Sequence, residues 1–212
     1  MKKLLIKVAI VFFCISCTEI RYIQQPIYPI LSLMNEKILI WPFQHISNSI
    51  AVRNNNELLN KLKGQSCALI IPFDSVSNIC YRNLIDFSDS MSVDQMFTFY
   101  SITNIRYILK GKLLNKSNKN GLLGPFLYEY EKKIYYPFSS DEGRWLTYEF
   151  DLYDLALKAK IYTLKVEAEA VSQDFKNSSG DIGRVYSLSS TNLNAIALKK
   201  GIKKLKKTFN CH

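Results

Sequence analysis

Short apolar runs that stop at proline predict strands in the first half of the chain. Residues 37–43 and 67–71 are such runs: a Pro-Phe pair ends the first and follows the second. Proline cannot donate a ladder hydrogen bond, so it is typical of the place where a strand stops. Between the two runs, three asparagines at 54–56 offer a helix N-cap, and residues 57–63 fit a short helix closed by Gly64. This order predicts a strand–helix–strand unit.

Helices and strands continue to alternate after residue 90. Residues 92–104 suit a helix capped by Ser92, residues 106–114 suit a strand, and residues 192–209 suit a closing helix. Together with the helix near 57–63, these elements predict an α/β fold class. We expect a single domain with a mixed sheet flanked by helices.

The longest extended segment covers residues 145–171, and its apolar positions change phase near Tyr162. Before Tyr162 the apolar residues are mostly odd-numbered, and after it they are even-numbered. A slip of one residue exchanges the two faces of a strand. The pattern therefore predicts a bulge or sharp bend at 161–163 that turns both Ile161 and Leu164 inward.

The closing helix separates apolar from basic residues. At about 100° per residue, one face carries Ala195, Leu198, Gly201, Ile202, Leu205 and Phe209, and the other carries Lys199, Lys200, Lys203, Lys204, Lys206 and Lys207. Two interpretations stay open. The lysines lie in water while the apolar stripe packs on the sheet, or they contact anionic phospholipid headgroups or an acidic partner.

The basicity of the chain is local. Its 212 residues carry a formal net charge of +10, and nine lysines in the first seven residues and the closing helix account for most of it. The remainder is close to neutral, which argues against a nucleic-acid-binding body. Hydrophobic residues make up 48% and charged residues 22%, the composition of a globular protein with a core.

The amino terminus has the order of a secretory signal. Lysines within the first seven residues precede an apolar run at 8–15, and Ser16 lies just before Cys17. Residues 14–17, Cys-Ile-Ser-Cys, resemble the lipobox of bacterial lipoproteins, although Cys14 stands where leucine is usual. The resemblance implies that residues 1–16 are a signal peptide and that Cys17 is acylated, with palmitate among its chains. A plain signal peptide followed by an incidental cysteine is the alternative.

Further expectations concern location and domain bounds. Thr18 rather than aspartate follows the cysteine, which resembles outer-membrane sorting and implies a lipid anchor that leaves the protein facing the periplasm, with surface exposure left open. Residues 17–36 contain prolines and paired glutamines without a clean period, which predicts a lipidated tether. Residues 37–212 are then the α/β domain.

Three segments resemble a known group of proteins. Residues 38–43 (ILIWPF), 104–113 (NIRYILKGKL) and 195–205 (AIALKKGIKKL) are similar, in this order, to segments of the TolB amino-terminal domain and of lipoproteins related to the curli-secretion channel. Asn104-Ile105 replaces the usual Gly-Ala of the group. The resemblance implies an α/β domain with a mixed sheet and a role in envelope assembly or export. It implies no enzymatic chemistry.

No motif predicts catalysis, a cofactor or a metal. The carboxylate pairs Asp141-Glu142 and Glu149/Asp151 lie in a loop and on an alternating strand, where we expect solvated surface. Nucleophile elbows and phosphate loops do not occur, and the spacing of cysteines and histidines is not that of a metal site. Cys67, Cys80 and Cys211 remain after Cys17, so three thiols leave one unpaired, and whether a disulfide forms stays open.

Aromatic residues concentrate in residues 126–138 and 145–153. They are typical either of hairpins inserted into a membrane by an oligomeric pore, or of an aromatic-rich sheet or a partner-binding face. The charges at 131–133 break the alternation of a membrane strand and favour the second interpretation. We therefore expect a lipid-anchored, non-catalytic envelope protein that acts by protein–protein binding in an assembly or export machine. The alternatives are a subunit of an oligomeric outer-membrane export pore, or a surface-exposed, adhesin-like lipoprotein. The expected partners are the membrane, through Cys17, and envelope proteins; oligomerisation stays open.

Overall fold

The computed structural model describes residues 18–26, 33, 35–63, 68–87, 92–116, 144–170, 172–176, 182–186 and 190–209. The chain divides into two compact units. The first comprises Met1–Arg21, Asn115–Leu146 and Glu167–Ala197, and the second comprises Tyr22–Leu114, Thr147–Val166 and Leu198–His212.

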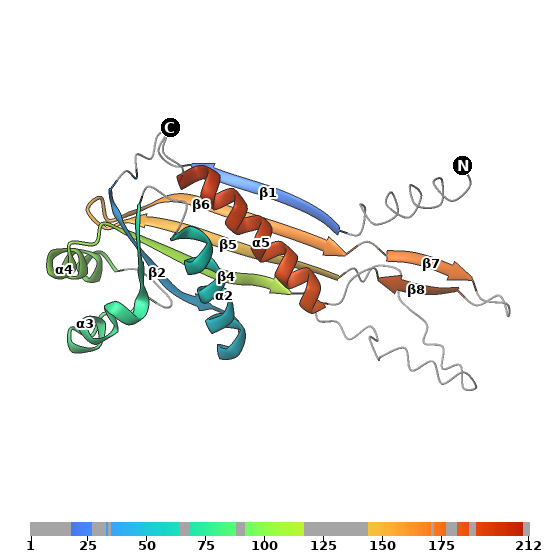
Figure 1. The fold of residues 1–212 in the computed structure, drawn as a ribbon, viewed down its shortest axis with the longest axis horizontal. Helices are drawn as coiled ribbons and strands as arrows, with labels where there is room; N and C mark the ends of the chain where they lie inside the picture. Colours follow the sequence, from blue (N-terminus) through green and yellow to red (C-terminus); the bar gives the residue numbers. More distant parts are fainter. Residues whose placement is uncertain are drawn as a thin grey trace. The chain divides into compact units, whose positions relative to one another are not determined.

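The secondary structure is built on a mixed six-stranded sheet with flanking helices, which confirms the predicted fold class (Figure 1). Its strand order is β1-β6-β5-β4-β2-β3. The strands are β1 (Thr18–Pro26), β2 (Lys37–Gln44), β3 (Leu69–Pro72), β4 (Tyr107–Lys116), β5 (Arg144–Asp154) and β6 (Ala159–Ala170). β2 runs parallel to both β3 and β4. Ile38 pairs with Ile70 and Tyr107, and the next residue, Leu39, pairs with Ile71 and Ile108. β5 runs opposite to β4 and β6 in Figure 1.

Two of the three predicted helices are found close to their expected bounds. α4 (Val93–Thr103) and α5 (Ser190–Phe209) lie within two residues of their predicted bounds. Ser92 caps α4 as predicted, because its hydroxyl accepts a hydrogen bond of 3.2 Å from the Gln95 amide. Asn104 then takes the left-handed conformation, φ 53°, which asparagine tolerates better than most residues.

The first helix differs from the prediction. α2 (Asn48–Leu62) begins nine residues before the expected start at residue 57, and its first turn follows Ser47. Asn54, one of the three asparagines expected to offer the N-cap, is instead fully buried inside the helix and donates a hydrogen bond of 2.9 Å to the hydroxyl of Tyr148. A tertiary partner has therefore overridden the local preference of asparagine for caps. Two short helices, η1 (Phe73–Ser75) and α3 (Ser77–Arg82), follow β3.

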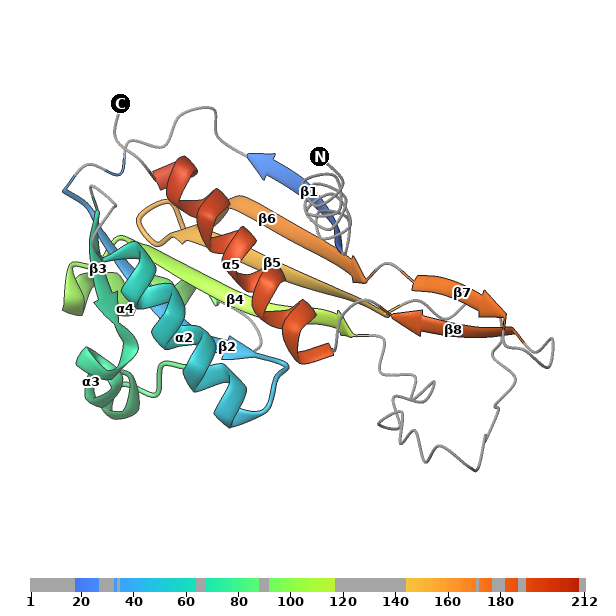
Figure 2. The ribbon, with the colours of Figure 1, turned by 45° about the vertical axis from the view of Figure 1, so that its right-hand side comes forward.

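Within the second unit, α2 and α5 lie on the same face of the sheet (Figure 2). On this face Phe43 packs edge-on against Tyr148 and Phe150, with ring centroids 5.9 Å apart in each pair. Gly111 makes room for Phe43, because a Cβ atom at Gly111 would stand 2.6 Å from that ring.

The opposite face packs against α3 and α4. Its core contains Leu39, Trp41, Val76, Cys80, Ile85, Phe87, Met96, Phe99, Ile105, Ile108 and Leu155. Trp41 and Phe43 thus face opposite sides of β2 although they are two residues apart. The register of β2 on β4 shifts between Trp41 and Gln44, and this irregularity at Pro42 explains the change of face.

The predicted extended segment 145–171 is two strands rather than one. Residues Leu155–Lys158 form a turn between β5 and β6, with Lys158 at φ 55°. The turn has no glycine, proline or asparagine, but Asp154 stabilises it: its Oδ1 accepts hydrogen bonds of 3.0 and 3.2 Å from the amides of Ala156 and Leu157. Ile161 and Leu164 are both buried, as predicted.

The predicted tether also differs from the structure. Thr18–Pro26, assigned to the tether over 17–36, form β1 at the edge of the sheet. Most of its side chains are exposed, which explains why no apolar period marks the strand in the sequence. In the first unit, β7 (Ser172–Lys176) and β8 (Ile182–Tyr186) form an antiparallel pair.

Candidate functional site

Cys17 and residues 1–16 lie outside the described residues, so acylation of Cys17 stays a prediction. Of the remaining cysteines, Cys67 and Cys211 also lie outside them, whereas Cys80 is a buried free thiol in the core. Burial raises the pKa of the Cys80 thiol, which keeps it protonated and unreactive. Residues 126–143, including Asp141 and Glu142, are likewise outside the described part of the chain.

The apolar face of α5 matches the prediction except at one position. Leu198, Gly201, Ile202, Leu205 and Phe209 are buried against the sheet. Ala195, predicted to share this face, is exposed instead, and Ala197 is buried.

The lysines of α5 lie on the outer side of the helix. Lys199, Lys200, Lys203 and Lys207 are exposed and form the surface named here the basic face; Lys204 and Lys206 are half-buried. None of the four lysines of the basic face has an ion pair or hydrogen bond with a described residue. Among the described residues, no carboxylate balances their charges.

The edge strand β1 lies beside this helix. Lys204 Nζ stands 5.9 Å from the centroid of the Tyr22 ring, within the range of a cation–π contact. The hydroxyl of Tyr162 joins the two elements, because it accepts a hydrogen bond of 2.8 Å from Gln24 and lies 3.3 Å from the hydroxyl of Thr208. Tyr22 and the adjacent Ile23 are each 41% exposed, so apolar side chains border the lysines of α5.

A second surface gathers apolar side chains around α4. Val93 and Phe97 are one helical turn apart and 51% and 57% exposed. Lys158 Nζ lies 5.0 Å above the Phe97 ring, which places the β5–β6 turn and the exposed Leu157 next to it. Gln95, which lies in α4, donates a hydrogen bond from its Nε2 to the backbone oxygen of Leu84, which follows α3. Val93, Phe97 and Leu157, together with Leu84 beside Gln95, are exposed apolar residues on or next to α4 and are named here the α4 patch.

Leu84 has an unusual backbone conformation for its residue type. The amide of Ile85 donates to the oxygen of Cys80 and the amide of Leu84 to that of Tyr81, which together make a Schellman cap at the end of α3. Leu84 takes the left-handed position of this cap at φ 53°, where glycine is usual, and its side chain is 85% exposed. The cap therefore holds an apolar side chain in water at a cost in backbone strain.

Ion pairs hold the turn of the α4 patch in place. Asp154, which caps the turn, is 1% exposed and pairs with Arg106 through contacts of 2.9 and 3.0 Å. Arg106 also reaches Glu36 at 3.3 Å. Burial, with the nearby Asp154 carboxylate, raises the pKa of Tyr107 to about 12. This cluster fixes the base of β5 against β4 and so positions Leu157 and Lys158.

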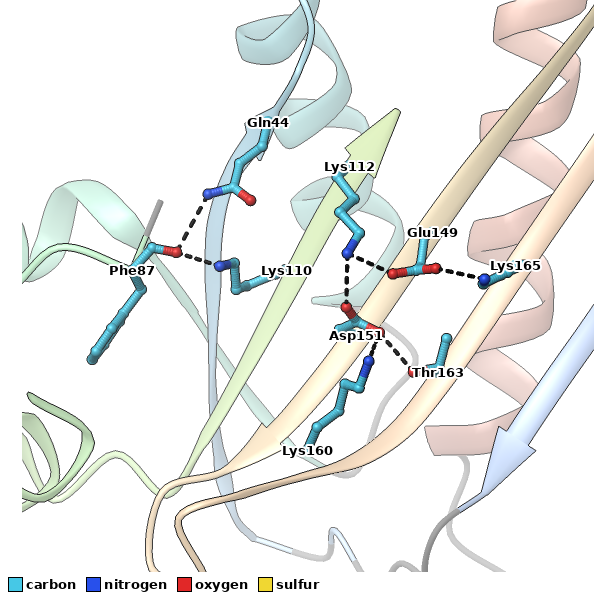
Figure 3. A network of polar contacts seen from close by, with 9 residues as sticks. All are labelled: Gln44, Phe87, Lys110, Lys112, Glu149, Asp151, Lys160, Thr163 and Lys165. Atoms are coloured by element: carbon cyan, nitrogen blue, oxygen red, sulfur yellow. Dashed lines mark hydrogen bonds and ion pairs between the residues drawn. The ribbon is translucent and has the colours of Figure 1, made fainter. Parts of the chain in front are cut away.

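Glu149 and Asp151, expected on a solvated surface, are instead buried in a network of lysines (Figure 3). Glu149 accepts from Lys112 at 2.6 Å and from Lys165 at 3.2 Å. Asp151 accepts from Thr163 at 2.6 Å and lies 3.4 Å from both Lys112 and Lys160. The prediction of a solvated surface was wrong, because the alternation along one strand does not reveal lysines brought from neighbouring strands.

The network favours the ionised forms of Glu149 and Lys112. Burial alone would raise the pKa of Glu149, but its hydrogen bonds to Lys112 and Lys165 outweigh burial and lower that pKa. Burial opposes the charge of Lys112 as well, and Glu149 and Asp151 still raise its pKa. Beside it, Lys110 and Gln44 both donate to the backbone oxygen of Phe87, which ties β4 and β2 to the loop after α3 (Figure 3).

Among the described residues, no three His, Cys, Asp or Glu side chains come together as metal ligands. No helix within the same ranges is long and apolar enough to cross a bilayer.

Comparison with known proteins adds a fold likeness. No protein-family model matches the chain, and no curated protein matches its sequence. Among solved structures, a PelC dodecamer from Paraburkholderia phytofirmans is similar with a TM-score of 0.47 at 12% identity, covering 92% of this chain and 100% of that chain. The hypothetical protein CT253 from Chlamydia trachomatis has a TM-score of 0.42 at 5% identity, covering 82% of this chain and 98% of that one. Lipoprotein GNA1162 from Neisseria meningitidis has a TM-score of 0.41 at 10% identity, covering 81% and 99%. Likeness at this level concerns the fold and assigns neither a family nor a function.

Proposed function

We propose that this chain is a lipid-anchored, non-catalytic protein of the bacterial cell envelope that acts by binding a partner protein in an assembly or export machine. Its anchor is Cys17, in the outer membrane and facing the periplasm. The observation that carries the proposal is the α4 patch, where four apolar side chains on or next to one helix are each more than half exposed.

The α4 patch has the features of a protein interface. Exposed apolar side chains that gather in one region of a protein mark sites of interaction more often than scattered ones do. Phe97 offers an aromatic anchor bordered by the charge of Lys158, and such centres surrounded by a polar rim carry most of the binding energy of interfaces. Leu84 is held in a strained conformation that exposes it, and strain of this kind gathers at binding sites. The partner chemistry that fits is an apolar segment of a second protein.

The buried carboxylates support a non-catalytic role. Glu149 and Asp151 are paired carboxylates of the kind that general acid–base catalysis uses, yet each already accepts hydrogen bonds or ion pairs from lysines. A general acid or base must exchange a proton with a substrate near neutral pH. The lowered pKa of Glu149 keeps it ionised there, so the network serves to join β4, β5 and β6.

The partner-binding part is tested by photo-crosslinking in cells. A photo-reactive amino acid at Phe97 should yield a defined adduct with an envelope protein, and Val93→Ser in the same chain should abolish it. Val52 of α2 is the matched control, because this apolar side chain is 59% exposed but lies outside the patch. The same adduct from Val52 and Phe97, or no adduct from Phe97, would contradict the proposal.

The anchor is tested separately. Mass spectrometry of the mature amino terminus should find an acylated Cys17, and Cys17→Ala should move the protein from the membrane fraction to the soluble envelope fraction. An unmodified Cys17, or cleavage at another residue, would rule out the lipid anchor while leaving the crosslinking result to stand by itself.

A further inference from the structure

We infer that the basic face of α5, together with Tyr22 and Ile23 of β1, lies flat against a bilayer surface rich in anionic phospholipid. The lysines would contact headgroup phosphates, and the two β1 side chains would enter the interfacial layer. This inference rests on the lipid anchor of the proposed function and adds an orientation to it: one side of the protein faces the membrane.

Charge is the first argument. The basic face has no ion pair or hydrogen bond with a described residue at Lys199, Lys200, Lys203 or Lys207. By contrast, Lys112 of β4 and Lys165 of β6 both pair with Glu149. Four cations on one side of a single helix complement a dense layer of phosphate. Each lysine near an anionic membrane strengthens binding by about fivefold.

The apolar neighbours are the second argument. Tyrosine and aliphatic side chains beside lysines are typical of segments that lie in the membrane interface. Tyr22 fits this pattern, because its ring is 41% exposed and Lys204 lies over it, with the charged head free to reach toward phosphate. Ile23, next in the strand, is equally exposed.

The short connection to the anchor is the third argument. β1 begins at Thr18, so no flexible spacer separates Cys17 from the sheet. Five residues of fully extended chain span at most about 18 Å, which keeps Tyr22 within that reach of the acylated cysteine. A protein held on so short a connection must place part of its β1 edge close to the headgroups. Lys204, next in the chain to Lys203 of the basic face, lies over Tyr22 of that edge.

The natural lysines can serve as probes. The acylated full-length protein, bound to vesicles of phosphatidylethanolamine with phosphatidylglycerol or to neutral phosphatidylcholine vesicles, would be treated with a water-soluble amine-acylating reagent. Modification of each lysine would be read by mass spectrometry after flotation. Lys61 of α2 and Lys63, the C-cap of that helix, are the internal controls, because both are exposed lysines outside the basic face.

We expect the four lysines of the basic face to be modified several times more slowly on anionic vesicles than on neutral ones, with the difference lost at high salt. Lys61 and Lys63 should react equally on both. In addition, Lys199→Gln with Lys203→Gln should remove the protection of Lys200 and Lys207, whereas Lys61→Gln with Lys63→Gln, an equal change in charge, should not.

Three results would overturn the inference. Equal modification on both vesicle types, with the protein still floating, would leave the anchor intact and reject the orientation. Protection in native membranes but not on pure lipid would assign the basic face to an acidic protein instead. A protein that does not float with either vesicle would reject the anchor and the orientation together.

Discussion

Gly201 of α5 lies so close to Phe150 of β5 that a Cβ atom on the glycine would stand 2.8 Å from Cε2 of the ring. The same Cβ atom would be 3.1 Å from Cγ2 of Val166 on β6. Glycine inside a helix costs about 1 kcal/mol relative to alanine. Its place in α5 is therefore explained by close packing of the helix on two strands, which also fixes the direction in which the basic face points.

Gly201→Ala should lower the free energy of unfolding by about 1 kcal/mol. Overpacking of a core costs about 1–3 kcal/mol, and the better helix propensity of alanine returns about 1 kcal/mol. Denaturant titration followed by circular dichroism measures the change. Lys203→Ala, an exposed substitution on the same helix, should stay within about 0.5 kcal/mol of the wild type. A Gly201→Ala protein at least as stable as the wild type would mean that α5 can move away from Phe150 at no cost.

The network around Glu149 predicts a pH dependence. Its pKa lies below the ordinary value of 4.5, so the folded state binds fewer protons than the unfolded state between these values, and stability rises with pH there. The contribution is complete above pH 4.5 and is lost as the pH falls through the lowered pKa.

Glu149→Gln should accordingly destabilise the protein by about 1–3 kcal/mol at neutral pH, because Lys112 and Lys165 lose an ionised partner. The difference from the wild type should shrink below about pH 4. Urea unfolding at a series of pH values measures it, with Asp74→Asn, at an exposed carboxylate, as the control. A difference that is constant from neutral to acidic pH would show that the ion pairs contribute nothing.

Periodicity was sufficient to predict the elements that pack by one apolar face. The inward face of α5, from Leu198 to Phe209, and the cap of α4 at Ser92 follow from side-chain spacing and local hydrogen bonding alone. The mixed sheet follows from the order of strands and helices. These features depend mostly on residues close together in the chain, so they can be predicted from the sequence alone.

Features that depend on distant partners were missed. From the sequence, Asn54 is expected at a helix cap. In the structure its hydrogen-bond partner is Tyr148, 94 residues away, which local sequence does not reveal. Asp151 suggests a solvated residue until Lys112, Lys160 and Thr163 surround it. The turn after β5 did carry a local signal, since Asp154 caps the next amides, but the apolar residues that follow concealed it. The α4 patch was missed because helix periodicity does not say which apolar side stays uncovered.

Burial on β6 gives a further prediction. Ile161 and Leu164 are 1% and 0% exposed, so Ile161→Asp and Leu164→Asp would each bury a charge without a partner and cost several kcal/mol. Both variants should lose cooperative thermal unfolding. Leu157→Asp makes the same chemical change at a side chain that is 53% exposed and should keep wild-type stability. Wild-type melting of both β6 variants would contradict the inward placement of the strand.

Leu84 offers a test that separates folding from binding. Leu84→Gly should raise the free energy of unfolding by about 0.5–1 kcal/mol, because glycine takes a positive φ without strain and this gain exceeds the entropy that it loses on folding. Leu69→Gly removes another exposed leucine, 55% exposed on β3, where no positive φ favours glycine, and should destabilise by about 0.5–1 kcal/mol. Thermal melts compare the two variants.

The same Leu84→Gly protein should give a weaker crosslink from Phe97 to its partner, since the α4 patch loses its most exposed side chain. A variant that is more stable but binds less well is what a side chain retained for binding predicts, because selection then tolerates its backbone strain. A more stable variant with an unchanged crosslink would remove Leu84 from the partner-binding surface and reduce the patch to Val93, Phe97 and Leu157. A variant less stable than the wild type would instead mean that the Leu84 side chain contributes to the fold.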